Sequence, residues 1–273
     1  MLRKCRPKAF GVVGSITVLT ALAISGTVAA SAWAVVGGPV WLVKGTVLAG
    51  GAKETLTSSG GVFKLDGTTN IECQTEKDTG EIIGTNPGLD LSTITFEKCF
   101  VEGKASCLAG NVTAESIEVH VQSLLVYQHE KPETTEQAYD AFFPDNGETS
   151  NNLFVEFTLT GGITPCGLLN GFKVNVNATG SLVTFDGINK KCGALAEVGH
   201  LNGLSEFVLS GAGEETTLGA LNSKGEPEEA TMWNSEKGIF ETLTCKLEAF
   251  GVALQLGVSD ISLVSGLSFG WEV

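Results

Sequence analysis

The residues of this chain that are best suited to chemistry are its cysteines. Seven occur in 273 residues, and six of these lie beyond residue 34, at positions 73, 99, 107, 166, 192 and 245. An even number of cysteines favours disulfide bonds over free thiols when a chain is exported. No C-x-x-C pair occurs, and no histidine follows a cysteine at zinc-finger spacing. The pattern therefore predicts neither a redox pair nor a structural zinc site.

The stretch CFVEGKASC predicts a β-hairpin that turns at Glu102-Gly103-Lys104. A three-residue loop containing glycine suits such a hairpin, and folding about Gly103 sets Cys99 opposite Cys107. We therefore expect a Cys99–Cys107 disulfide. The four remaining cysteines allow three pairing schemes, of which we favour Cys73–Cys166 with Cys192–Cys245.

Catalytic motifs are weak. GLSFG places Ser268 in the serine position of G-x-S-x-G, but that motif needs an acid and a histidine further along the chain. Only three residues follow the motif, and alternating apolar residues around Ser268 favour a strand. The three histidines are expected to be exposed polar residues rather than ligands: His120, His129 and His200.

Two surface motifs could bind an ion or carry a glycan. The loop FPDNGETSNN gathers the oxygen donors Asp145, Asn146 and Glu148, which Ca²⁺ would accept, although the spacing is not that of an EF-hand loop. An ordinary Asp-Asn-Gly turn is the alternative. Asn111 and Asn177 begin N-glycosylation triplets, which matter only if the source glycosylates exported proteins.

Residues 1–34 have the three parts of a secretory signal peptide. Basic residues from Arg3 to Lys8 are followed by an apolar run over 9–24, and small residues Ala32 and Ala34 give a cleavage pattern. A retained membrane anchor is the alternative, but the run is shorter than the roughly 20 residues that a spanning helix needs. We expect cleavage after residue 34, no membrane span in the mature chain, and an extracellular or cell-surface location.

The mature chain is strongly acidic. Beyond residue 34 it carries 13 lysines against 31 acidic residues, a formal charge of −18, and both arginines lie in the leader. Nucleic-acid binding needs a cationic surface, and bidentate phosphate binding uses arginine. The composition therefore predicts no nucleic-acid partner.

The segments that would position these residues are predicted to be strands. Period-2 alternation marks residues 153–159, 172–176 and 117–121, and glycine turns separate such runs, so we expect an all-β antiparallel sandwich or sandwich-like barrel with disulfide bridges. The one helical candidate is PETTEQAYDAFFP, residues 132–144, and irregular structure is the alternative there. Residues 35–273 form one domain or two related lobes with a boundary in 129–152. LAGGAKET (48–55) and LSGAGEET (209–216) would be equivalent segments of such lobes, or a chance repeat of turn sequences.

One family resemblance extends over about residues 40–110, and at most to Cys166. WLVKGTVLAGG (41–51), IEC (71–73), FEKC (96–99) and then Cys107 resemble a pattern in uncharacterised secreted β-rich proteins of actinobacteria. The resemblance implies an exported bacterial β-protein, and it implies no substrate.

Three classes of function follow. The first is a secreted or surface-associated non-catalytic protein with a structural or binding role and no cofactor, and every positive signal supports it. The second is an extracellular hydrolase acting on glycans through a carboxylate pair that the sequence does not identify. An outer-membrane protein is disfavoured, because two tyrosines make no aromatic girdle and six cysteines suit a soluble domain.

Overall fold

The structure is a computed structural model, and it describes residues 37–67, 69–127, 138–145, 153–161, 166, 171–176, 182–185, 188–198, 214–218, 229–234, 237–249 and 252–272. The chain divides into two compact units, Met1–Ala34 and Val35–Val273. The predicted signal peptide lies outside the described residues, and all that follows concerns the second unit. Within the described residues no helix is both long enough and apolar enough to cross a membrane.

The described residues are almost entirely β-structure, as the alternating pattern predicts. The strands are β1 Val40–Val43, β2 Thr46–Val47, β3 Lys53–Gly60, β4 Phe63–Asp66, β5 Ile71–Cys73, β6 Thr75–Ile83, β7 Leu89–Glu97, β8 Phe100–Val101, β9 Lys104–Gly110, β10 Ser116–Tyr127, β11 Ala138–Pro144, β12 Leu153–Thr160, β13 Phe172–Val176, β14 Leu182–Phe185, β15 Ile188–Lys191, β16 Ala194–Val198, β17 Glu214–Leu218, β18 Glu229–Asn234, β19 Ile239–Thr244, β20 Leu247–Glu248, β21 Val252–Leu263 and β22 Phe269–Glu272.

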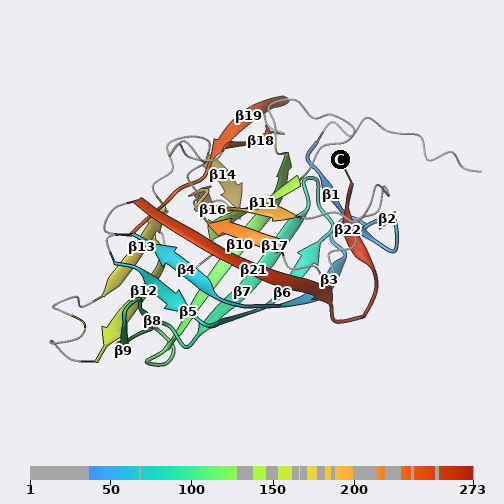
Figure 1. Cartoon of the computed structure of the whole chain (residues 1–273). Helices are drawn as coiled ribbons and strands as arrows, with labels where there is room; N and C mark the ends of the chain where they lie inside the picture. Colours follow the sequence, from blue (N-terminus) through green and yellow to red (C-terminus); the bar gives the residue numbers. More distant parts are fainter. Residues whose placement is uncertain are drawn as a thin grey trace, which may run out of the picture. The chain divides into compact units, whose positions relative to one another are not determined.

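Eight of these strands pair antiparallel in a ring. β3, β6, β7 and β10 run side by side (Figure 1), and the pairing continues through β11, β16 and β17 to β21. β21 then pairs with β3 and closes the ring. The result is the barrel alternative of the predicted fold class, and a barrel of eight strands has an interior that side chains can fill.

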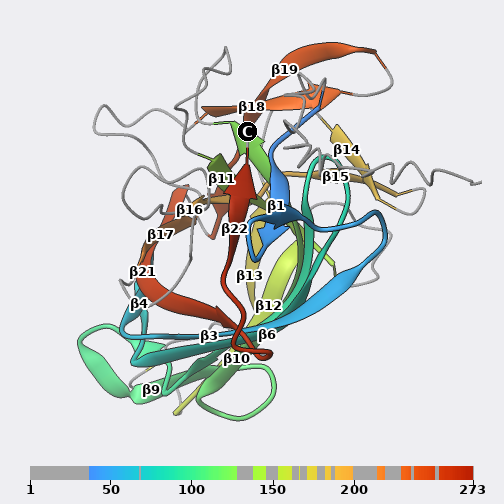
Figure 2. The same cartoon turned by 90° about the vertical axis from the view of Figure 1, so that its right-hand side faces the viewer.

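Shorter strands continue from the ring and enclose the largest apolar core. They pair in the order β4, β5, β8, β9, β12, β13 and β20, with β4 and β20 both also paired to β21. Phe157 and Phe172 stack at the centre of this core with ring centroids 4.9 Å apart. A separate small sheet joins β1 to both β2 and β22, and Figure 2 shows β1 and β22 side by side.

The helical candidate 132–144 is a strand where the structure describes it, neither a helix nor irregular. Residues 138–144 form β11, which pairs with β10 from Tyr127↔Ala138 to Val121↔Pro144 and with β16 on its other edge. The aromatic residues of this segment suit a strand, and pairing on both edges fixes it as one. Residues 132–137 lie outside the described residues. The predicted boundary in 129–152 overlaps β11, which is a strand of the ring. The two-lobe arrangement stays a prediction.

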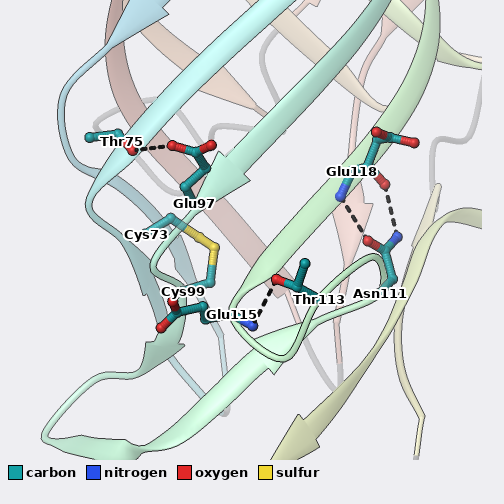
Figure 3. Close-up of a disulfide and its surroundings, with 8 residues drawn as sticks. All are labelled: Cys73, Thr75, Glu97, Cys99, Asn111, Thr113, Glu115 and Glu118. Atoms are coloured by element: carbon teal, nitrogen blue, oxygen red, sulfur yellow. Dashed lines mark hydrogen bonds between the residues drawn. A yellow bond between two sulfur atoms is a disulfide. The ribbon is translucent and has the colours of Figure 1, made fainter.

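Three disulfides join the six predicted cysteines. Cys192–Cys245 is the expected pair, whereas the Cys99–Cys107 and Cys73–Cys166 pairings are wrong. Cys73 pairs instead with Cys99, as Figure 3 shows, and Cys107 pairs with Cys166.

The physical reason is a bulge in the predicted hairpin. The β8–β9 hairpin exists, and Gly103 at its tip has a φ of +74°, which suits glycine. Its register shifts between Phe100 and Val101, however, so Phe100 lies opposite Leu108 and the Cys99 carbonyl accepts a hydrogen bond from the Ala109 N–H. A bulge of this kind places Cys99 two residues out of register with Cys107 and leaves it facing Cys73.

Candidate functional site

A groove of about 280 Å³ lies between the turn after β6, the β14–β15 hairpin and β18. Its apolar part comes from buried or half-buried side chains, and its polar part from hydroxyl and amide residues. The lining residues are Thr85, Asn86, Pro87, Leu89, Leu124, Val183, Thr184, Phe185, Met232, Trp233 and Asn234. None of them carries a formal charge, although the chain has 31 acidic residues.

Hydrogen bonds hold the polar rim in place. The Gly38 N–H donates to Asn86 Oδ1 at 2.9 Å, and Thr85 Oγ1 donates to the Pro87 carbonyl at 2.6 Å. On the opposite side Thr184 Oγ1 donates to Asn189 Oδ1 at 2.7 Å. The apolar part is equally fixed, because the Phe185 ring packs against Phe143 with centroids 5.1 Å apart. The groove is thus preformed rather than dependent on rearrangement.

A second cavity lies inside the apolar core, between β4, β7, β10, β12 and β13. It measures only about 50 Å³ and its lining is almost wholly apolar, with Phe63, Phe96 and Phe154 among the residues. A cavity of 150 Å³ is needed to hold a benzene ring, so this one is a packing void rather than a ligand site.

The most unusual chemistry lies inside the ring of eight strands. Antiparallel partners share a face of the sheet, and the register places Ser58 opposite Asp78, Gly80 opposite Ser92 and Ser123 opposite Asp90. The serines and aspartates among these residues are buried, whereas the other face of the same strands carries exposed ion pairs such as Lys53–Glu81 and Lys77–Glu97. The polar set therefore faces the interior of the barrel. We call Glu76, Asp78, Asp90 and Asp140 the acidic cluster.

Burial raises the pKa of every member of the acidic cluster. It raises the pKa of Asp78 to about 7 and that of Asp140 also to about 7. Burial, followed by the charges of Asp140 and Asp78, holds the pKa of Asp90 well above its usual range. The pKa of Glu76 is raised by burial and lowered in part by hydrogen bonds from Ser259 and Ser58.

Two carboxyl oxygens of this interior lack a hydrogen-bond partner among the described residues. Ser92 Oγ donates to Asp90 Oδ1 at 2.6 Å. In contrast, Asp78 Oδ1 and Asp140 Oδ1 are buried and have no partner. Hydrogen bonding from Ser92 and Ser123 lowers the pKa values of Asp78 and Asp140 only in part, because burial is the larger effect on both. Buried polar atoms are normally paired, so the two remaining carboxyl oxygens would accept a further hydrogen bond.

The acidic cluster does not form a metal centre or an open active site. Among the described residues no three His, Cys, Asp or Glu side chains come together in a metal-binding arrangement. Neither cavity is lined by an aspartate or a glutamate. The cluster can therefore take up and release protons, but a substrate in either cavity would not meet it.

The predicted calcium ligands are not brought together by what the structure describes. Asp145 Oδ1 forms an ion pair at 3.0 Å with the buried Lys190 Nζ, so this carboxylate already has a cationic partner. Asn146 and Glu148 lie outside the described residues, as do His129, His200 and Asn177.

The other predicted residues have structural partners. His120 is half exposed, with Nδ1 3.0 Å from Thr93 Oγ1 and Nε2 3.2 Å from a Glu118 carboxylate oxygen. Ser268 directly precedes β22, whose Phe269 and Trp271 are buried, so this segment is the predicted last strand. The Asn111 amide binds both the N–H and the carbonyl of Glu118 and holds the turn between β9 and β10 (Figure 3).

The acidic cluster was missed because its strands carry a misleading pattern. In β7 the sequence LDLSTITFE alternates leucine with Asp90 and Ser92, and the leucines would be expected to face inward. The opposite holds, because Asp90 and Ser92 are the more buried residues. A signal did exist: aspartates recur at even positions 78 and 90 on adjacent antiparallel strands, a spacing that places them on one face.

The chain matches no protein-family model, no curated protein sequence and no solved structure. The resemblance of residues 40–110 to secreted actinobacterial proteins therefore stays a prediction.

Proposed function

We propose that this chain is a secreted or cell-surface-associated, non-catalytic binding protein whose groove receives a neutral sugar ring or a closely similar uncharged polyol. The observation that carries the proposal is the uncharged lining of a preformed groove in a strongly acidic chain. Ligand sites combine an apolar wall with a few polar groups that fix orientation, and this groove has both.

The size and polarity of the groove select the ligand class. Its 280 Å³ lies at the lower end of small-molecule pockets, which span roughly 300–1,000 Å³. The wall formed by Leu89, Val183 and Phe185 suits an apolar face, and the exposed amide and hydroxyl of Asn86 and Thr184 suit hydroxyl groups at its edge. A charged ligand would lose hydration without gaining an ion pair. A neutral sugar ring combines an apolar face with a hydroxyl edge.

Two observations support export. Three disulfides fit an oxidising compartment, and residues 1–34 have a signal-peptide pattern. The predicted resemblance of residues 40–110 to secreted proteins agrees with both. The mature charge of −18 is that of a soluble protein that does not bind polyanions.

The hydrolase alternative has less support. Glycoside hydrolysis needs two carboxyl groups about 5–9.5 Å apart across a cleft. The carboxyls with the most perturbed pKa values face the barrel interior, and none lines the groove. We therefore place recognition rather than bond cleavage at this groove.

A blocking substitution tests the proposal. Thr184→Trp adds a bulky side chain at the exposed rim, and Val62→Trp adds the same group at an exposed position that does not line the groove. We would titrate neutral mono- and disaccharides, with glucuronic acid and glucosamine as charged counterparts, and follow NMR shifts. Shifts at groove residues that Thr184→Trp abolishes and Val62→Trp preserves are expected. Binding that Thr184→Trp leaves intact, binding only of charged sugars, or no binding of any sugar would contradict the proposal.

A further inference from the structure

The interior of the eight-stranded ring holds four carboxyl groups and, among the described side chains, no cation. β6 contributes Glu76 and Asp78, β7 contributes Asp90, and β11 contributes Asp140. The exposed fractions of the three aspartates are 9%, 5% and 8%. Four ionised carboxylates at this burial would repel one another strongly in a medium of low dielectric constant.

Three other strands of the ring face these carboxyls with serine hydroxyls, and the register adds one small and one acidic residue. β3 presents Ser58, β10 presents Ser123 and β21 presents Ser259. In the backbone register, Ala196 of β16 lies opposite Asp140, and Glu214 of β17 lies opposite Ser259. The only histidine described, His120, is exposed on the other face of β10, and the buried Lys190 is engaged by Asp145 outside the ring.

The unpaired oxygens indicate which state of the carboxyls the barrel accommodates. Among the described residues, Asp78 Oδ1 and Asp140 Oδ1 are buried without a hydrogen-bond partner, so each carboxyl has one oxygen that no neighbouring donor reaches. An ionised carboxylate only accepts hydrogen bonds, whereas a protonated carboxyl also donates one. Protons on these aspartates would supply the missing donors and remove the repulsion at the same time.

The ring also has one weak seam. β6 and β7 share nine register pairs, and β3 and β6 share eight, but within the described part of the chain β16 and β17 share only Leu195↔Thr217 and Ala196↔Thr216. The seam lies next to the acidic cluster, because Ala196 is also the direct partner of Asp140. Loss of two backbone pairings is the smallest disruption that would open the ring.

We propose that protonation of the acidic cluster keeps the ring of eight strands closed. Release of these protons to solvent opens the ring between β16 and β17. Each step is a simple ionisation, in which an aspartic acid gives its proton to water and keeps the negative charge. The ionised carboxylates then repel one another and draw water into the interior. The two backbone pairings between β16 and β17 break first. The raised pKa values of Asp78 and Asp140 place this transition near neutral pH. It is independent of any ligand in the groove.

Hydrogen–deuterium exchange can locate the opening. Protection factors, corrected for the intrinsic pH dependence of exchange, would be measured for residues 194–198 and 214–218 between pH 5.5 and 8.5, with residues 75–83 as an internal reference. The opening constant rises about tenfold per pH unit for each carboxyl that loses a proton on opening. We expect protection at the seam to fall at least tenfold over this range while β6 retains its protection.

Matched variants and a direct titration keep the test decisive. Asp78→Asn/Asp140→Asn should abolish the fall at the seam, and Glu115→Gln, which removes an exposed charge, should leave it unchanged. Two results would overturn the proposal. One is protection at the seam that does not change with pH in the wild type, and the other is a loss of protection with rising pH that persists in the double variant. If the double variant does not fold, ¹³C titration of the wild-type carboxyls decides: titration of Asp78 and Asp140 near pH 4 would also overturn it.

Discussion

Raising the pH from 4 to 7.5 should destabilise this protein, and the structure gives both the sign and the size of the effect. Asp78 and Asp140 have an ordinary pKa of 3.8 that burial raises to about 7. Between these values the folded chain holds protons that the unfolded chain has released. Unfolding therefore releases protons, and rising pH favours it throughout this window.

The magnitude follows from the size of the shift. A change of about three pKa units at about 1.4 kcal/mol per unit lowers the free energy of unfolding by about 4 kcal/mol for each carboxyl. Asp90 and Asp140 interact, so the combined loss is smaller than a simple sum and lies at about 4–8 kcal/mol. Domains are stable by only about 5–15 kcal/mol, so this loss is a large fraction of the total.

Exposed carboxylates act in the opposite direction, and only weakly. Hydrogen bonds from Lys77, Lys64 and Lys237 lower the pKa values of Glu97, Glu102 and Glu241 respectively. Their contribution is present above their unfolded pKa and is lost as the pH falls through their folded pKa. All three are solvent-screened surface pairs, so they do not offset the acidic cluster.

Urea unfolding at half-unit pH steps measures this dependence. The free energy of unfolding should be greatest at about pH 4 and should fall continuously to pH 7.5, with an unchanged m-value. The Asp140→Asn variant should show a shallower slope. A free energy that is flat or rises between pH 4 and 7 would refute the assignment of these carboxyls to a buried, protonated interior.

The remaining predictions concern other contacts. Replacing Cys192 and Cys245 with alanine opens a loop of 53 residues and should lower the free energy of unfolding by about 4 kcal/mol in urea titrations; a loss under 1 kcal/mol would contradict a bridged native state. Gly80→Ala would place a Cβ 2.6 Å from the Leu91 carbonyl oxygen, so thermal unfolding should show a lower Tm than the wild type, and an unchanged Tm would refute that close approach. Asp145→Asn leaves the buried Lys190 without its carboxylate and should cost about 1–3 kcal/mol, with or without Ca²⁺; a loss that appears only when Ca²⁺ is present would instead support the calcium loop.

Local patterns predicted several strands of this protein directly. Residues 153–159 and 172–176 alternate apolar and polar side chains, and they form β12 and β13 with the apolar face in the core. The Cys192–Cys245 pair followed from nothing stronger than a preference among three schemes. The predicted Cys99–Cys107 disulfide was wrong because the residue types of the β8–β9 hairpin do not indicate its bulge.

Long-range closure and interior polarity could not be inferred in the same way. The ring depends on β21 meeting both β17 and β3, which are far apart in sequence, and no local pattern encodes that contact. The interior of the ring breaks the rule that apolar residues face inward, so Asp90 was indistinguishable from a surface residue until its partner strands were known. The groove likewise draws its lining from four segments between Thr85 and Asn234.

Disulfide mapping of the native protein, recovered outside its source cells without reductant, tests the central claim most directly. An exported, oxidised barrel predicts a chain that begins at Val35 and yields three linked peptide pairs, Cys73–Cys99, Cys107–Cys166 and Cys192–Cys245. An intracellular chain that retains residues 1–34 and carries six alkylatable thiols would contradict it.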